Sequence, residues 1–362
     1  MRRQHEIGGE PHKRRKPRSE RGKPRRTLFV EPGFAFHDPE LSAPDMRPPR
    51  TAFDVNRRRS HNGRQMPAAI RIIDKAVLDR RRQRALRAAT PGATFLLEAV
   101  ADDLSERLAT VKRRFARAVE IGSPLPLVAE RLLASGQIDR LWRLDRLAET
   151  GADLIGDEEV LPFAPASLDL LVSALALQFT GDLPGALAQI RRALRPDGLL
   201  LAALLGGETL TELRTSLAAA EAELTGGASP RVAPFAELRT AGALLQRAGF
   251  ALPVIDQDRL TVRYGDMFGL LRDLRAMGAT NALVERSRRP LPRAVLTRAA
   301  AIYGERFADP DGRVRATFDV ISLSGWAPDE GQQKPLKPGS ARARLADALG
   351  AVERSAGEKA GG

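Results

Sequence analysis

Short apolar runs alternate with amphipathic stretches between residues 117 and 205, and this alternation constrains the fold more than any other feature of the chain. Five runs have the length and composition of β-strands: Ala118–Ile121, Gln137–Leu144, Gly151–Ile155, Leu168–Ala174 and Leu199–Leu205. Helices are predicted at 127–133 and 183–194, the second ending at a Pro-Asp-Gly turn. Alternating strands and helices predict an α/β fold with a parallel, doubly wound, Rossmann-like sheet.

The pattern changes after residue 210, where helices predominate. Two further strands are predicted, at Val254–Tyr264 and Ala316–Gly325, because apolar residues alternate along both. Helices are predicted before them, at 211–223 and 234–248, and between them, around Met267–Met277 and at 292–307. We therefore expect a mostly parallel, seven-stranded sheet whose last two strands pair antiparallel at one edge, with helical insertions near that strand pair.

Four regions are expected along the chain. Residues 1–65 contain eight prolines and clusters of Arg and Lys without periodicity, which is typical of a disordered basic leader. Residues 66–116 are expected to cap the domain with two helices, a basic amphipathic one at 70–90 and a second at 93–114. Residues 117–330 form the main domain, and 331–362 a loose tail. Because the character of the sequence changes at Met66, an alternative is that Met66 is the true start.

The formal net charge of +13 lies mainly in the leader. Residues 1–65 carry 17 Lys and Arg against 8 Asp and Glu, a net +9, so the remaining residues carry +4. The leader could serve as a tail for nucleic acid or an anionic membrane, but the globular part has an ordinary charge. This distribution argues against nucleic acid as the partner of the domain.

Histidine and cysteine are absent from Met66 onward, since all four histidines lie in the leader and the chain has no cysteine. A Ser-His-Asp triad, a Cys-His pair and a histidine-ligated metal site are therefore excluded from the domain, and we predict no metal site. The longest apolar runs, 168–179 and 199–205, are too short to cross a bilayer. We expect a cytoplasmic protein, with peripheral attachment at the inner face of the membrane as an alternative.

An open parallel sheet binds its ligand beyond the carboxyl ends of its strands, where strand order reverses. The first predicted strand ends with Glu120, Gly122 and Ser123, which would face the amino-acid part of a nucleoside cofactor. The second ends at Asp145, 23 residues after Gly122, a spacing suited to accept hydrogen bonds from ribose hydroxyls.

The third and fourth strand ends complete the candidate site. Asp157 and Glu158 follow the third strand and are placed to contact an adenine amino group, while Ser173 begins a segment that would form the pocket floor. One such carboxylate is usually only a solvated loop charge. Acidic residues at three successive strand ends favour a cofactor site, although no catalytic residue can be assigned.

Several motifs carry a family resemblance that covers about residues 70–345. Three of them, at 161–163, 168–173 and 194–198, resemble the core of class I S-adenosylmethionine-dependent methyltransferases. More specific are Gly206-Gly207-Glu208-Thr209-Leu210, Glu212-Leu213-Arg214, Met277-Gly278, Asn281, Ala316-Thr317 and Gly325-Trp326. Together they resemble the branch that contains the methyltransferase-fold mitochondrial complex I assembly factor and its alphaproteobacterial relatives, and they are similar to malonyl-carrier-protein methyltransferases.

The resemblance implies S-adenosylmethionine as cofactor, and a protein substrate or complex I subunit as partner. The chain departs from the family in its first loop, where Pro124 and Pro126 replace two glycines. Proline fixes φ, lacks an N–H and adds bulk where glycine lets the backbone approach the cofactor, so both changes should weaken binding. Gln178-Phe179 also replaces a family His-Trp pair.

Three functions remain open from the sequence. The first is a methyltransferase of unknown acceptor, because methyl transfer depends mainly on proximity and orientation and needs neither His nor Cys. The second, implied by the resemblance, is a complex I assembly factor that hydroxylates peptidyl arginine, although a conventional non-haem iron site would need two histidines. The third is a non-catalytic binding protein with a decayed cofactor site.

Overall fold

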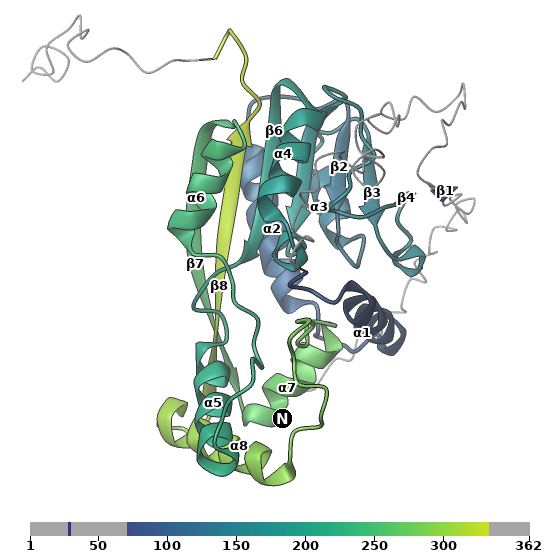
Figure 1. Cartoon of the computed structure of the whole chain (residues 1–362). Helices are drawn as coiled ribbons and strands as arrows, with labels where there is room; N and C mark the ends of the chain where they lie inside the picture. Colours follow the sequence, from purple (N-terminus) through teal and green to yellow (C-terminus); the bar gives the residue numbers. More distant parts are fainter. Residues whose placement is uncertain (1–27, 30–70, 333–362) are drawn as a thin grey trace, which may run out of the picture.

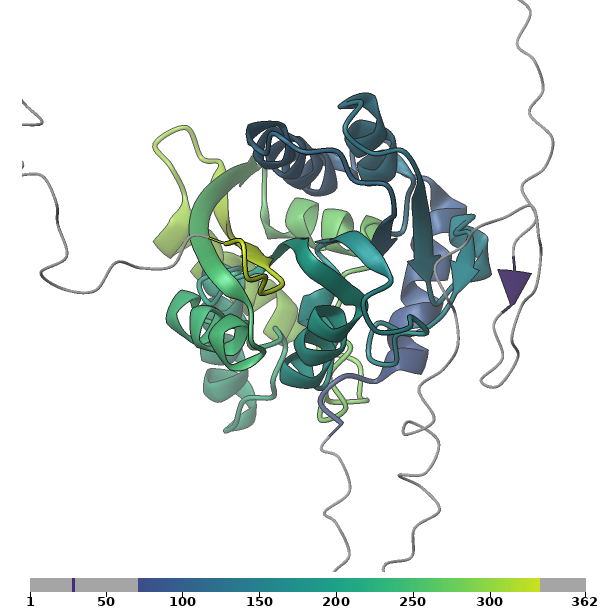
Figure 2. The same ribbon diagram turned by 90° about the horizontal axis from the view of Figure 1, so that it is seen from above.

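A computed structural model describes residues 28–29 and 71–332 of the chain. Apart from Leu28–Phe29, the predicted leader at 1–65 lies outside the described residues, as do the alternative start at Met66 and the tail from 333 onward. The described chain forms one α/β body with helices on both faces of a twisted sheet (Figures 1 and 2).

The sheet contains eight strands, all parallel except one. In spatial order they are β1 (Leu28–Phe29), β4 (Leu154–Ile155), β3 (Leu141–Asp145), β2 (Ala118–Ile121), β5 (Leu168–Ala174), β6 (Leu194–Leu205), β8 (Val314–Trp326) and β7 (Ala251–Tyr264). β8 is antiparallel to both of its neighbours, β6 and β7. The predicted doubly wound, mostly parallel sheet is confirmed, with the two-residue β1 added beyond the seven expected strands.

Two hydrophobic cores lie on opposite faces of this sheet, because successive strand residues point to opposite sides. On β5, Leu170 and Val172 belong to one core and Leu171 to the other. The first core is covered by α2 (Phe95–Thr110), α3 (Leu127–Ala134), α5 (Thr211–Thr225), α7 (Met267–Ala276) and α8 (Arg293–Phe307). The second is covered by α4 (Leu183–Ala193) and α6 (Leu238–Arg247).

Three predicted boundaries are corrected by the structure. The strand expected at 137–144 begins at Leu141, since Ile138 makes only an isolated bridge to Phe115. The strand expected at 151–155 is reduced to Leu154–Ile155, after a short 3₁₀ turn, η1 (Ala148–Thr150). The turn expected at 195–198 is part of β6, where the pairing with β5 shifts register.

Two helices that are far apart in the sequence, α1 and α7, both lie at the carboxyl ends of the central strands. α1 (Lys75–Ala88) precedes the sheet and begins at Asp74, whose side chain accepts a hydrogen bond from the amide of Val77. α7 belongs to the insertion between β7 and β8 and lies beside α1 (Figure 1). Together they enclose the space beyond the ends of β2 and β5.

Candidate active site at the strand ends

A cavity of about 410 Å³ lies beyond the carboxyl ends of β2 and β5. β2 and β5 are neighbours in the sheet, with β3 and β4 on one side and β6 on the other, so the strand order reverses between them. This is where open α/β sheets bind their ligands. The volume falls within the roughly 300–1,000 Å³ typical of small-molecule sites.

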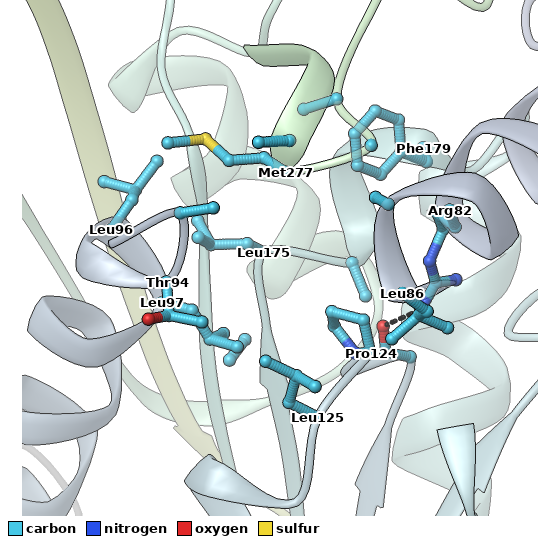
Figure 3. Close-up of a pocket in the computed structure, with 18 of the residues that line it drawn as sticks. Arg82, Leu86, Thr94, Leu96, Leu97, Pro124, Leu125, Leu175, Phe179 and Met277 are labelled. Carbon is cyan, nitrogen blue, oxygen red and sulfur yellow. Dashed lines mark hydrogen bonds between the residues drawn. The ribbon is translucent and has the colours of Figure 1, made fainter. Parts of the chain in front are cut away.

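Most of the cavity lining is apolar and comes from helices and loops (Figure 3). α1 contributes Leu78 and Leu86, the connection to α2 contributes residues 89–94, and Met277 follows α7. The strand ends contribute Gly122, Pro124, Leu125, Ala174, Leu175, Ala176, Gln178, Phe179 and Leu205. The part of the site built by α1 and α7 was not predicted from the sequence as ligand-contacting.

Gly122 is one of two predicted site residues that line the cavity, the other being Glu158. Its backbone has φ +77°, a conformation that favours glycine. A Cβ placed there would lie 2.4 Å from Cβ of Ala176, in the segment that follows β5. Gly122 is therefore required for the first loop to pass close to the end of β5.

Asp145 lies at the end of β3 but is already engaged by protein groups. Its carboxylate is 1% exposed, with Oδ2 2.7 Å from Nη2 of Arg82 on α1. The other oxygen accepts a hydrogen bond from the amide of Leu147 at 2.8 Å. Nη2 of Arg82 also donates to the carbonyl of Gly122 at 3.0 Å (Figure 3). Arg82 thus fills the position expected for ribose hydroxyls.

Glu158 lines the cavity, and one oxygen of its carboxylate has no hydrogen-bond partner. Its side chain is buried, and Oε2 accepts no hydrogen bond within the described structure. Burial raises the pKa of Glu158 to about 7, and the charge of neighbouring Asp157 adds to this effect. Asp157 itself does not line the cavity, because it is ion-paired with Lys75 of α1 and with Arg146.

The remaining predicted residues lie beneath the first loop. Arg143 of β3 contacts Glu120 at 3.3 Å and donates to the carbonyl of Ser123 at 3.0 Å. Burial raises the pKa of Glu120 to about 7, although the positive charge of Arg143 opposes the shift. Ser173 is fully buried in β5, and its hydroxyl finds no partner among the described residues. The side chains of Glu120, Ser123 and Ser173 therefore do not line the cavity.

The two prolines of the first loop have different environments. Pro124 lines the cavity, so its ring stands where the family has a glycine. Pro126 immediately precedes α3, with φ −72°, and its carbonyl accepts from the amide of Glu130 at 2.9 Å. Proline is well suited to a helix N-terminus, where its missing N–H would have had no helical partner.

Arg82 is a cavity-lining residue that the sequence did not single out. A signal was present, because Val77 and Leu78 mark the inward face of α1, and Arg82 follows Leu78 by four residues. The sequence predicted a basic amphipathic helix at 70–90 and assigned no binding role to its arginines. In the structure, the arginines of this stretch divide between the inside and the outside of the helix.

The residues around the cavity fit a nucleoside cofactor, provided that Arg82 moves away from Asp145. Gly122 and Glu158 both line the cavity, and the Glu158 oxygen that has no partner can accept from an amino group once its side chain turns toward the cavity. Asp145 can accept from ribose hydroxyls only after Arg82 moves away. Among residues 71–332, no group of three or more acidic side chains is arranged to hold a metal ion.

The sheet order, the glycine turn and the strand-end cavity define a class I methyltransferase-like protein. A family model described as "Methyltransferase domain" matches residues 134–202. The "Arginine-hydroxylase NDUFAF5, mitochondrial" of Danio rerio is 38% identical over 263 residues, covering 70% of this chain and 81% of its own. The Homo sapiens protein of the same name is 36% identical over 296 residues, covering 78% and 84%.

A second group of relatives is named for methyl transfer. The malonyl-[acyl-carrier protein] O-methyltransferase of Methylovorus sp. (strain MP688) is 33% identical over 244 residues, covering 67% of this chain and 75% of its own. The similarity to the Danio rerio and Homo sapiens arginine hydroxylases extends over more of both chains. The chain belongs to the family of the arginine hydroxylase NDUFAF5, with the fold of S-adenosylmethionine-dependent methyltransferases.

Proposed function

We propose that the protein binds S-adenosylmethionine in the strand-end cavity and transfers its methyl group to an acceptor that enters the same cavity. The observation that carries this proposal is Glu158, a carboxylate residue that lines the cavity together with the positive-φ turn at Gly122 and has one buried oxygen, Oε2, without a hydrogen-bond partner. The buried oxygen costs free energy unless a ligand supplies a donor. An adenine amino group is such a donor.

The contacts of the bound cofactor follow from the positions of the strand-end residues. Glu158 would accept from the adenine amino group, and Asp145 would accept from the ribose hydroxyls once Arg82 has withdrawn. The first loop at Gly122 would lie beside the chain that joins the ribose to the amino-acid part, while Glu120 and Arg143 support that loop. The bound cofactor supplies an electrophilic methyl carbon on a sulfonium ion.

The apolar lining is consistent with methyl transfer. This reaction is a direct displacement that depends on holding acceptor and methyl carbon in line with water excluded. Leu96, Leu175 and Met277 lie around one part of the cavity (Figure 3). They form an apolar wall that can position an acceptor without acting on a proton, so we assign no catalytic residue.

Titration calorimetry of S-adenosylmethionine and S-adenosylhomocysteine into the full chain tests cofactor binding. Asp145→Asn should weaken binding at least about tenfold, because a charge-assisted hydrogen bond to ribose contributes roughly 1.5–3 kcal/mol. The matched control is Asp139→Asn, at an exposed residue paired with Arg114 on the surface. Failure of the parent protein to bind either ligand would refute the proposal.

Peptidyl-arginine hydroxylation is a second candidate, favoured by the sequence similarity to proteins named for that activity. Hydroxylation inserts oxygen into a C–H bond, so it needs an oxidant that S-adenosylmethionine does not supply. The partner would then be an arginine-containing protein, with a complex I subunit as the expectation from the resemblance. Mass spectrometry of respiratory-chain subunits from cells with and without the protein distinguishes gain of an oxygen atom from gain of a methylene.

A non-catalytic binding protein remains the outcome if the cofactor site has decayed. In that case the parent would not bind S-adenosylmethionine, whereas Pro124→Gly with Pro126→Gly would. We expect a cytoplasmic location for this chain, although the names of its relatives place those proteins in mitochondria. None of the helices in residues 71–332 combines the length and apolar composition needed to cross a bilayer.

A further inference from the structure

The two ends of α1 are held in the fold by different means. The start of α1 lies in a small core, separate from the two main ones, that consists of Ile73, Val77, Leu78, Ala282 and Leu283. From Asp79 to Phe95, by contrast, every residue is exposed or half-buried. We define the gate as residues 82–94, which comprise the end of α1 and its connection to α2. The gate is therefore not anchored in either main core.

The gate forms an outer wall of the cavity. Arg82, Leu86 and residues 89–94 line the cavity. Arg84 and Arg87 of the same segment are exposed. Figure 3 shows Arg82 and Leu86 extending from α1 along one side of the cavity. One layer of chain thus separates this part of the cavity from solvent, so a displacement of that layer would widen the way in.

The connection between α1 and α2 has the backbone of a hinge. Ala89 has φ +42° and Gly92 has φ +78°, and both residues are exposed. A Cβ added to Gly92 would meet no atom within 4 Å. Hinges are a few loop or terminal residues that absorb changes in φ and ψ, and segments with few buried contacts open at a lower free energy than the core. Packing in the first core resumes only at Leu96 and Leu97.

Polar contacts fasten the gate to the strand ends. Nη2 of Arg82 lies 2.7 Å from Oδ2 of Asp145 and 3.0 Å from the carbonyl oxygen of Gly122. The next residue, Gln83, donates from Nε2 to Glu149 at 3.0 Å, in an exposed contact. The Arg82 contacts are the more buried of the two sets, because the Asp145 carboxylate is 1% exposed. Arg82 is therefore the main fastening of the gate.

We propose that the gate opens to admit ligands to the cavity, with the ion pair between Arg82 and Asp145 as its latch. A ligand whose hydroxyls bind Asp145 stabilises the state in which Arg82 has left, so ligand binding and gate opening are coupled. The identity of that ligand, a nucleoside cofactor, rests on the proposed function. Opening itself also occurs in the unliganded protein, where the latch keeps the open state rare.

Thiol labelling measures opening without any ligand. The chain has no cysteine, so Ala174→Cys introduces a single thiol, at a cavity-lining position that is 1% exposed. N-ethylmaleimide can reach this thiol only after an opening, so the labelling rate follows the open population. Adding Arg82→Gln should accelerate labelling at least about tenfold, because a charge-assisted hydrogen bond is lost from the closed state. Adding Arg80→Gln, on the exposed face of α1, should leave the rate unchanged.

A second thiol separates gate opening from unfolding of the whole domain. Ala299→Cys lies in α8, in the first core, and Ala299 is 0% exposed. Its labelling requires loss of the core packing and not movement of the gate. Arg82→Gln should therefore accelerate labelling of Ala174→Cys far more than labelling of Ala299→Cys.

A reversible lock tests the coupling between gate and ligand. A Cβ added to Gly278, in the turn after α7, would lie 3.3 Å from Cβ of Ala85 in the gate, close to the separation of about 3.8 Å in disulfides. Ala85→Cys with Gly278→Cys should therefore hold the gate closed when oxidised. The oxidised protein should bind S-adenosylhomocysteine at least about tenfold more slowly than the same protein after reduction, as measured by surface plasmon resonance. The single variant Ala85→Cys should not respond to the reductant.

Three results would overturn the gate. They are equal labelling of Ala174→Cys with and without Arg82→Gln, an equal acceleration at Ala299→Cys, and equal association rates for the oxidised and reduced double-cysteine protein. Failure of the proposed function would look different. In that case neither the parent nor any variant binds S-adenosylhomocysteine, while Arg82→Gln still accelerates labelling of Ala174→Cys selectively, a result that supports the gate and rejects the cofactor.

Discussion

Nη2 of Arg82 lies 2.7 Å from Oδ2 of Asp145, so the first helix holds the carboxylate at the end of β3. Lys75 of the same helix holds Asp157 after β4. In this way α1 neutralises two of the acids that the sequence assigns to the cofactor. Protein cations and ligand hydroxyls therefore compete for the same acceptor.

Replacing Arg82 should increase cofactor affinity. Arg82→Gln frees Asp145 from its ion pair, so S-adenosylhomocysteine should bind about tenfold more tightly, the equivalent of roughly 1.4 kcal/mol. The ligand-free variant should melt at a lower temperature, because it retains a buried carboxylate without its cation. Calorimetry and thermal melts measure both effects. Arg80→Gln, on the exposed face, is the control, and an unchanged affinity in Arg82→Gln would show that Arg82 does not compete.

Cofactor affinity should depend on the ionisation of Glu158, whose pKa burial raises to about 7. A donor amino group prefers the ionised carboxylate, so affinity should rise with pH up to about 7 and then level off. In Glu158→Gln this part of the pH dependence should disappear. Titrations at a series of pH values provide the measurement, and an identical slope in parent and variant would contradict the assignment.

The same raised pKa values predict how stability changes with pH. Glu120 and Glu158 have folded pKa values of about 7 against ordinary values of 4.5, so both bind protons more tightly when folded. Their contribution to stability is complete below about pH 4.5 and is lost as pH rises through about 7. Thermal melts should show Glu158→Gln stabilised relative to the parent above pH 7, and a variant destabilised there would refute this.

The turn at Gly122 should not tolerate a side chain. Gly122→Ala places Cβ in contact with Ala176 in addition to the strain of a positive φ, so it should cost about 3 kcal/mol or more. Gly136→Ala is the matched control, since Gly136 has φ +69° and no atom within 4 Å of its added Cβ. It should cost about 1 kcal/mol. Equal losses in chemical denaturation would indicate strain alone.

The two prolines of the first loop should have separable effects. Pro124→Gly removes a ring from the cavity wall and should strengthen cofactor binding severalfold. Pro126→Gly lies at the start of α3 and should lower the melting temperature with little effect on binding. Calorimetry and melts on both single variants separate the two, and a gain in affinity from Pro126→Gly would contradict this assignment.

Strand–helix alternation was sufficient to predict most of the fold. β5 and the β7–β8 pair lie within a few residues of their predicted positions, because long apolar or alternating runs specify strands strongly. The short β4 and the start of β6 were placed less well. Their limits depend on pairing with neighbouring strands and on a register shift beside Leu168, neither of which a local pattern contains.

The candidate site was predictable only in part, for a related reason. Gly122 and Glu158 line the cavity, because strand ends of a parallel sheet meet at one edge, and their role in binding a cofactor stays a prediction. Sequence position could not show that Asp145 and Asp157 are ion-paired with α1, or that Glu120 lies under the loop with Arg143. The two ion pairs depend on how α1 packs across the sheet, and the contact of Glu120 with Arg143 depends on the pairing of β2 with β3.

The antiparallel β8 also determines when the sheet can be completed during synthesis. β8 pairs with both β6 and β7, and the residues between β7 and β8 include Met277, which lines the cavity. β8 is the last strand in the described part of the sequence, so during synthesis it is made after the other strands described there. Until it emerges, β6 has an open edge, and the nascent chain is exposed to mispairing or proteolysis.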